Sequence, residues 1–263
     1  MLLYAAALLW GVHPGPANAL RTAPVTTHYR VETKTETTVD LSGVGQPNQQ
    51  VNLGVTSWIA VTLSDTTGGR ILHVVVDSLK YDGGAPQLTQ SSVDSARGGT
   101  LHGFVEASGH VKEIVAQPAD NIFLSDVQGV IHSFFPKVRT GAKTGDIWTD
   151  TVEVTNTQNG SNIKSKFAIK YTAGDRSSVS GVPALKLSST SSATMSGTAQ
   201  NPMAGSMEVE GTVTGTSESF VGADGRYLGG SSASTSNQLL KVAMAPAPIP
   251  VKTIRTVTVS VIP

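Results

Sequence analysis

The sequence contains few groupings of side chains that could carry out chemistry. The motifs of serine hydrolases, phosphate-binding loops and zinc proteases do not occur in it. The chain has no cysteine, which excludes disulfides, cysteine nucleophiles and cysteine-based metal centres. The histidines after the first 19 residues are scattered and show no metal-ligand spacing; they are His28, His73, His102, His110 and His132. We therefore predict a protein that is not an enzyme and that holds no cofactor or metal.

One acidic residue could be functional. Asp77 has the same parity as Ile71 and Val75 in the segment 71–81, which is apolar on both faces. A buried, unpaired carboxylate is costly. Asp77 is therefore either a functional acid with a raised pKa or a carboxylate near a strand end that is solvated or bonded to a neighbour. The second interpretation is the simpler one.

Aromatic and aliphatic side chains supply the candidate binding surface. Trp58 lies on the opposite parity from the apolar face of its own strand, so it either lines a cleft or packs in the core, and we favour packing. Trp148 is expected to pack where a central helix meets the second half of the chain. If the fold encloses a hollow, we expect its lining to include Trp58, Phe123, Val127, Ile131, Phe134 and Trp148.

Composition narrows the class of protein. The formal net charge is zero, so the chain lacks the basic surplus typical of nucleic-acid binding. Only 14% of residues are charged, and Ser, Thr, Gly and Val are abundant. This composition suits antiparallel sheets better than helices. A chain of 263 residues can bury one large core or two small ones.

Residues 1–19 have the features of a secretory signal peptide. The apolar run 2–12 is too short for the roughly 20 residues that span a bilayer. It is followed by two prolines and by Ala17-Asn18-Ala19, which has the pattern of a cleavage site. No later apolar stretch has spanning length, and no cysteine is present for lipidation. We expect a periplasmic or secreted protein that begins near Leu20 and does not span a membrane.

Alternation of side chains predicts β-strands along most of the chain. The segment 29–41 places Tyr29, Val31 and Leu41 on one face and charged residues on the other. The segment 71–81 reads as a central strand with two buried faces. Further strands are expected at 55–63, 100–106, 110–115, 147–155, 164–171, 184–195, 207–221, 227–242 and 253–262, with hairpin turns at 108–109 and 224–225.

The segment 120–135 breaks this pattern and predicts an amphipathic helix. Its apolar residues recur at helical spacing and form one stripe, which consists of Ile122, Phe123, Val127, Val130, Ile131, Phe134 and Phe135. Asp120 is a suitable N-cap, and Pro136 ends the helix.

A weak internal repeat suggests two similar halves. The pattern F-V-x-A-[S/D]-G-[H/R] occurs at 104–110 and again at 220–226. It divides the chain into halves of about 25–117 and 145–262, which the helix 120–135 joins. Reuse of common glycine turns is the alternative explanation.

The predicted strands could be arranged in three ways. A membrane-spanning barrel needs aromatic girdles, but aromatics are only 5% of this chain and are scattered. Two separate sandwiches would each need their own core, yet the helix lies between the halves. We therefore predict a mainly β fold: residues 20–263 form a single domain, a large curved antiparallel sheet of about eleven strands, shaped as a half-barrel, with the amphipathic helix on its concave face.

Short motifs support a resemblance to a known family. Tyr29-Arg30-Val31-Glu32-Thr33, the segment 129–136 that ends in Phe-Phe-Pro, and Gly145-Asp146-Ile147-Trp148 together resemble a group of exported bacterial proteins of unknown function. The architecture is also similar, more distantly, to the outer-membrane lipoprotein carrier and receptor fold. That likeness implies acyl-chain binding in a hollow between sheet and helices.

Two function hypotheses follow. The first is a non-enzymatic envelope protein that binds a lipid or another apolar ligand between sheet and helix. The alternative is a structural or protein-interaction module with a filled interior, no small ligand and an unknown protein partner. The two hypotheses differ in whether the space beneath residues 120–135 is hollow or filled with side chains.

Overall fold

The computed structural model describes residues 24–83, 89–106, 109, 111–139, 141–156, 162–201, 205–223, 225–243 and 245–262. The expected signal peptide at 1–19 lies outside these residues, as do Ser108 and Asp224 of the two predicted hairpin turns. Gly109 and Gly225, the second residues of those turns, have φ angles of +88° and +79°. Glycine adopts such left-handed angles readily because it has no Cβ.

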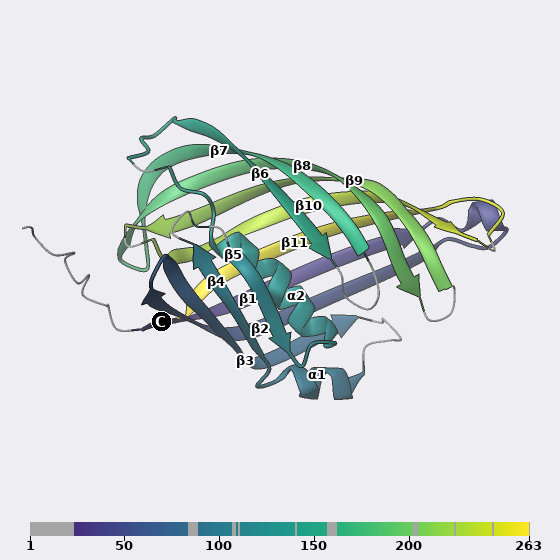
Figure 1. Cartoon of the computed structure of the whole chain (residues 1–263), viewed down its shortest axis with the longest axis horizontal. Coiled ribbons are helices and arrows are strands. Elements are labelled where there is room, and N and C mark those ends of the chain that lie inside the picture. Colours follow the sequence, from purple (N-terminus) through teal and green to yellow (C-terminus); the bar gives the residue numbers. More distant parts are fainter. Residues whose placement is uncertain are drawn as a thin grey trace, which may run out of the picture.

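Eleven strands form one antiparallel sheet that curls around a helix (Figure 1). The strands are β1 Val25–Val39, β2 Gln49–Thr66, β3 Gly69–Gly83, β4 Thr100–Glu106, β5 Val111–Gln117, β6 Ile147–Asn156, β7 Asn162–Val179, β8 Val182–Asn201, β9 Gly205–Gly222, β10 Tyr227–Val242 and β11 Ile249–Ile262. The prediction of a mainly β protein with one large curved antiparallel sheet of about eleven strands is confirmed.

The strand order brings the two ends of the described chain together in the middle of the sheet. It runs β5-β4-β3-β2-β1-β11-β10-β9-β8-β7-β6, so β1–β5 occupy one half and β6–β11 the other. The halves meet where β1 pairs with β11, for example Val31 opposite Val259. β5 and β6 are the edge strands and do not pair within the described ranges, so the sheet stays open there. The duplication that would explain two similar halves stays a prediction.

The predicted central helix is present, with a shorter N-terminal end. α2 spans Ile122–Ile131 and continues as the short 3-10 helix η2, His132–Phe134. Its N-cap is Asn121, whose Oδ1 accepts hydrogen bonds from the backbone N–H groups of Phe123 and Leu124 at 2.9 and 3.2 Å. The prediction of Asp120 as the cap was therefore wrong by one residue. A second 3-10 helix, η1 (Ser42–Val44), lies between β1 and β2.

A second α-helix, α1 (Gln90–Ala96), was not predicted. Its N-cap is Thr89, whose side chain accepts a hydrogen bond from the backbone N–H of Ser92. Val93 and Ala96 are buried in the core. The Asn121 side chain donates hydrogen bonds to Ser92 O at 2.8 Å and to Ser95 Oγ at 2.7 Å, so one residue both starts α2 and attaches it to α1.

A β-bulge explains the outcome at Asp77. Asp77 is an extra residue in the pairing of β3 with β2, and it shifts the alternation so that Val76 and Leu79 are both buried. Ile71 on the other face is 50% exposed, so the prediction of two buried faces was wrong. The Asp77 carboxylate is about half exposed and lies 3.6 Å from His28 Nδ1. It is partly solvated, as favoured, but the bulge rather than a strand end places it.

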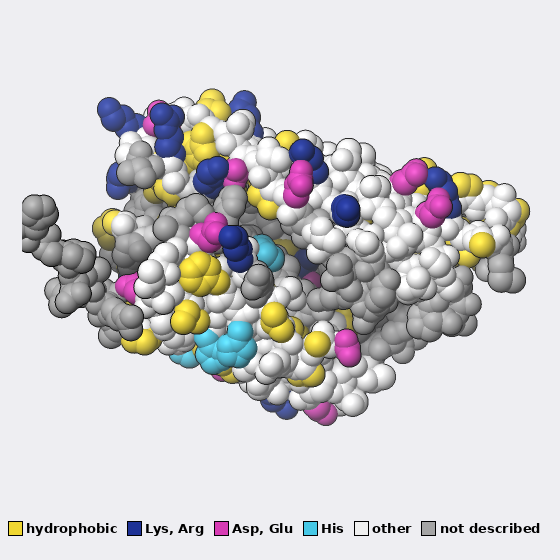
Figure 2. Space-filling model, in the orientation of Figure 1, with side chains coloured by type: hydrophobic (Ala, Val, Ile, Leu, Met, Phe, Trp, Pro, Cys, Tyr) yellow, Lys and Arg dark blue, Asp and Glu magenta, His cyan; other side chains and the backbone are white. Residues whose placement is uncertain are grey.

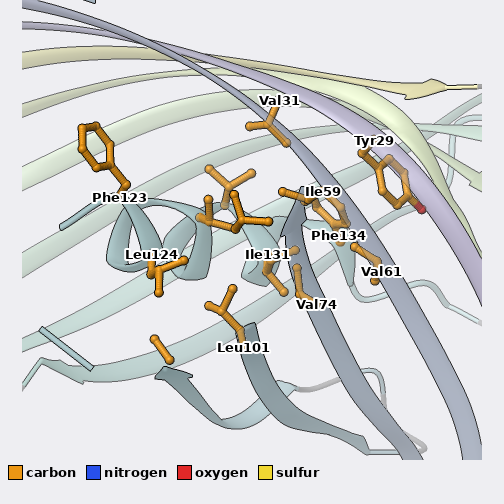
Figure 3. Close-up of a cluster of buried hydrophobic side chains, with 14 of the residues drawn as sticks. Tyr29, Val31, Ile59, Val61, Val74, Leu101, Phe123, Leu124, Ile131 and Phe134 are labelled. Carbon is orange, nitrogen blue, oxygen red and sulfur yellow. The ribbon is translucent and has the colours of Figure 1, made fainter. Parts of the chain in front are cut away.

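The main core lies between α2 and the face of the sheet that α2 contacts, which we call the inner face. Figure 3 shows helix side chains directed toward strand residues such as Val31, Ile59 and Leu101. Phe134 packs at the end of this cluster with its ring centroid 4.8 Å from that of Tyr29. The expected position of the helix on the concave face is confirmed. A smaller cluster in the second half consists of Ala142, Ala173, Leu187 and Val221, with Trp148 and Leu185 packed against it.

Candidate ligand-binding surface

The space between α2 and the first half of the sheet is filled. Phe123, Val127 and Ile131, which we expected to line a hollow, are at most 2% exposed and belong to the main core. Their neighbours in the cluster are themselves fully buried, among them Leu72 and Val74 of β3. The packing gives no support to a ligand directly beneath these three residues, and their lining role stays a prediction.

Trp58 lies on the face of the sheet away from α2. Its neighbours Ser57 and Ile59 are buried, and Trp58 between them points to the opposite, outer face, where it is half-buried. Lys80 Nζ lies 5.6 Å from the centroid of the Trp58 ring, a cation–π arrangement. The expectation that Trp58 packs in the core or lines an inner hollow is therefore corrected, because strand alternation directs its ring to the outside.

Trp148 anchors the connection between the helix and the second half. Its ring stacks on Tyr171 of β7 with centroids 5.6 Å apart, and its Nε1–H donates a hydrogen bond to the Lys137 carbonyl at 2.8 Å. Lys137 Nζ in turn lies 2.7 Å from Asp150 Oδ1. Burial raises the pKa of Tyr171, so this phenol stays neutral. Trp148 occupies the position expected from the sequence, and the contacts give it a structural role.

An uncharged inner row of side chains crosses the sheet beyond the helix. The residues directly opposite one another on eight neighbouring strands are Val152, Phe167, Ala193, Val213, Ser236, Thr253, Thr37 and Val51, from β6 across to β2. Ala193 is buried, and the others are half-buried. We call this set the inner row. It combines apolar surface with a few hydroxyl groups and contains no ionisable side chain.

The charged residues beside the inner row point to the opposite face. Along β7 and β9, exposed charged side chains alternate with the inner residues; they are Lys164, Lys166, Lys170, Glu208, Glu210 and Glu218. Several form ion pairs with neighbouring strands, such as Lys166 with Glu153 at 3.0 Å and Lys241 with Glu210 at 2.8 Å. In Figure 2, Lys and Arg side chains gather mostly at the upper left of the visible face. These charges therefore lie on the outer face, while the inner row itself is uncharged.

An ion pair lies between the packed core beneath α2 and the part of the inner face that α2 does not cover. Arg255 of β11 lies two residues along the strand from Thr253 of the inner row, so both side chains are on the same face. Its guanidinium donates a hydrogen bond to Asp126 Oδ1 of α2 at 2.5 Å. Burial raises the pKa of Asp126, and Arg255 opposes this shift by stabilising the carboxylate. The helix thus reaches β11, and the inner row continues past it toward β6.

The histidines form one unexpected pair. His73 and His102 face each other across β3 and β4, with stacked rings whose centroids are 4.6 Å apart. Burial and the neighbouring His102 lower the pKa of His73. The sequence could not reveal this pair because the two residues come from different strands. Among the described residues, no group of three or more His, Asp or Glu side chains could hold a metal ion.

Comparison with known proteins gives only distant likenesses. No family model matches the chain, and no curated protein matches it. A structure of lipid–protein interactions in lipovitellin is 10% identical, with a TM-score of 0.47, and the match covers 90% of this chain and 25% of that one. A mutant porin of Rhodopseudomonas blastica is also 10% identical, with a TM-score of 0.28, over 89% of this chain and 100% of that one.

The chain therefore spans about a quarter of the length of the lipovitellin chain that it matches. The resemblance to an exported bacterial family stays a hypothesis. Within the described ranges, no helix combines the length and apolar character that a membrane crossing requires.

Proposed function

We propose that this protein is a non-enzymatic protein of the cell envelope that binds an acyl-chain lipid or a similar apolar ligand along the inner row. Export is part of the proposal and is supported by the signal-like residues 1–19. The ligand site is shifted from the position expected from the sequence. It lies beyond α2, along the inner row from β6 across to β2, because the space beneath the helix is packed.

The observation that carries the proposal is the sorting of charge between the two faces. Half-buried Val152, Phe167 and Val213 belong to the uncharged inner row on the concave face, while the lysines and glutamates of the same strands point outward. Partly exposed apolar surface of this kind gains free energy when an apolar ligand covers it. The gain is about 0.8 kcal/mol for each methylene group removed from water, so a medium-length acyl chain gains enough to bind before ordering costs are subtracted.

The competing function is a structural or protein-interaction module without a small ligand. The observation that favours it is the completeness of the main core, where Phe134, Ile131 and Leu101 are at most 2% exposed. Such a protein would use its open edge strands, β5 or β6, to pair with a partner strand. The two functions differ in one measurable respect, since only the first requires the inner row to be occupied by a small molecule.

The test combines lipid extraction with a matched pair of variants. The purified protein is extracted with organic solvent and the extract analysed by mass spectrometry, and a dansyl-labelled undecanoic acid is titrated in parallel. Val213→Glu places a charge on the inner row, whereas Thr214→Glu places the same charge next to it on the outer face. Val213→Glu should weaken binding at least about tenfold, and Thr214→Glu should leave it unchanged.

Circular dichroism melting of both variants shows that each is folded before binding is compared. If the extract contains no lipid and the wild-type protein does not bind the labelled acid, the ligand-binding proposal fails and the module without a ligand is favoured. Equal effects of the two variants would also contradict the proposed site.

A further inference from the structure

A cavity lies at the other end of the strands from the inner row. It has a volume of about 270 Å³ and is bounded by the start of β1, the end of β2, the start of β10 and the end of η2. Three aromatic rings form its floor: Phe134 stacks on Tyr227 at 4.5 Å and packs against Tyr29 at 4.8 Å. The floor is held in place by the Tyr29 hydroxyl, which donates a hydrogen bond to the Tyr227 carbonyl at 2.8 Å.

The floor of this cavity is apolar and stays uncharged. Tyr29, Phe134 and Tyr227 are each at most 6% exposed. Burial raises the pKa of Tyr227, and the nearby Tyr29 hydroxyl contributes to the same shift. Val61 and Leu63 of β2 form the adjoining wall. A ligand that enters here meets hydrocarbon and aromatic surface first, so its inner part must be apolar.

The rim carries an excess of positive charge. Two arginines, Arg70 and Arg226, and one acid, Asp65, line the opening. Asp65 and Arg226 already take part in polar interactions. Arg70 has no hydrogen bond or ion pair within the part of the chain that the structure describes. A half-buried guanidinium beside an apolar cavity offers several donors to a planar anion, for which arginine is well suited.

We propose that this cavity binds a small amphipathic anion, with a short hydrocarbon body on the Tyr29–Phe134–Tyr227 floor and a single carboxylate at Arg70. The two features are complementary in one ligand class, because the floor excludes charge and the rim supplies one unpaired cation. A neutral alcohol of the same length gains the apolar contact but not the charge-assisted hydrogen bonds. The site is independent of the inner row, from which it is separated along the strands.

The experiment compares three probes that share one chain: octanoate, 1-octanol and octylammonium. Binding is measured by isothermal titration calorimetry, and the position of binding by chemical-shift changes of the Tyr29, Phe134 and Tyr227 rings. Octanoate should bind about tenfold or more tightly than 1-octanol, and octylammonium should bind most weakly. The ring signals of the three floor residues should shift with octanoate.

Variants assign the anion to its partner. Arg70→Gln should reduce octanoate affinity about tenfold and leave 1-octanol affinity unchanged, and Arg70→Lys should restore part of the loss. The matched control is Arg97→Gln, which removes an exposed arginine elsewhere, 4.0 Å from Asp94. It should have no effect.

Three results would overturn the proposal: no octanoate binding, equal affinities for octanoate and 1-octanol, or equal effects of Arg70→Gln and Arg97→Gln. A fourth result would also overturn the proposal: octanoate binding that is lost in Val213→Glu but retained in Arg70→Gln would place the anion on the inner row. The two proposals fail separately when the labelled acid is also titrated into Arg70→Gln, because this variant lacks the proposed carboxylate site and Val213→Glu in the same background then tests the inner row alone.

Discussion

Asp126 of α2 and Arg255 of β11 lie 2.5 Å apart, although they are 129 residues apart in the sequence. The contact joins the helix, which follows the first half of the sheet, to the last strand of the second half. Both side chains are only about 30% exposed. The pair therefore fixes the helix over the junction of the two halves, next to the inner row.

Removal of one partner of this pair should destabilise the fold more than removal of both. Arg255→Met leaves the Asp126 carboxylate partly buried without its cation, at a cost of about 1–3 kcal/mol. The double variant Asp126→Leu with Arg255→Met removes both charges and should recover part of that loss. Urea unfolding of the two single variants and the double variant measures the coupling. Additive losses would contradict the pairing.

A charge in the helix stripe should unfold the protein. Val130 is 4% exposed in the main core, so Val130→Asp buries an unpaired carboxylate and should lower the free energy of unfolding by about 4 kcal/mol or more. The control is Ile122→Asp, at an exposed position in the first turn of α2, which should change stability by less than about 0.5 kcal/mol. Thermal melts compare them. An unchanged melting temperature for Val130→Asp would refute the packing of α2.

Asn121 should matter far more than Asp120. Asn121→Ala removes the cap of α2 and its two hydrogen bonds to α1, with an expected loss of about 2 kcal/mol. Asp120→Ala, at an exposed neighbouring position, should have little effect. Asn121→Asp keeps the capping oxygens but loses the amide donor to Ser92 O, so its stability should lie between the two. Chemical denaturation at neutral pH ranks the three variants.

Stability should fall as the pH drops below about 6.5. The pKa of His73 is lowered in the folded protein by burial and by His102, so the unfolded chain takes up its proton first and acid favours unfolding. Burial lowers the pKa of His132, which acts in the same direction. Urea midpoints at pH 8 and pH 5.5 should therefore differ, and the difference should shrink in His73→Asn. If His73→Asn kept the full wild-type difference between the two pH values, His73 would be excluded as a cause of the loss of stability in acid.

The alternation of side chains was sufficient to predict the strands, and helical spacing was sufficient for α2. Alternation could not predict the bulge at Asp77, because an extra residue in a segment that is apolar on both parities does not visibly interrupt the pattern. The sequence did not predict α1, because a helix of seven residues with two buried side chains is too short to show a helical repeat of apolar residues. Asp120 and Asn121 are both good caps, and only the contact with α1 selects Asn121.

The binding surfaces were harder to predict than the fold. The sequence predicted a strand at 164–171, but it did not show that the apolar face of this strand extends beyond the helix. The Arg70 cavity depends on residues from β1, β3 and β10 and on the end of the helix, which only the folded sheet brings together. Trp58 was misplaced because a large aromatic suggests burial, while its strand position directs it outward.

The pairing of β1 with β11 also constrains the order of assembly. Thr33, for example, finds its partner Val257 only after the chain has been synthesised through β11. Until then β1 is the edge strand of the first half: it pairs with β2, but the backbone donors and acceptors on its other side are open to wrong partners. Contacts of such long sequence separation form slowly, so β1 stays open to wrong partners for longer than strands whose neighbours follow them directly in the chain.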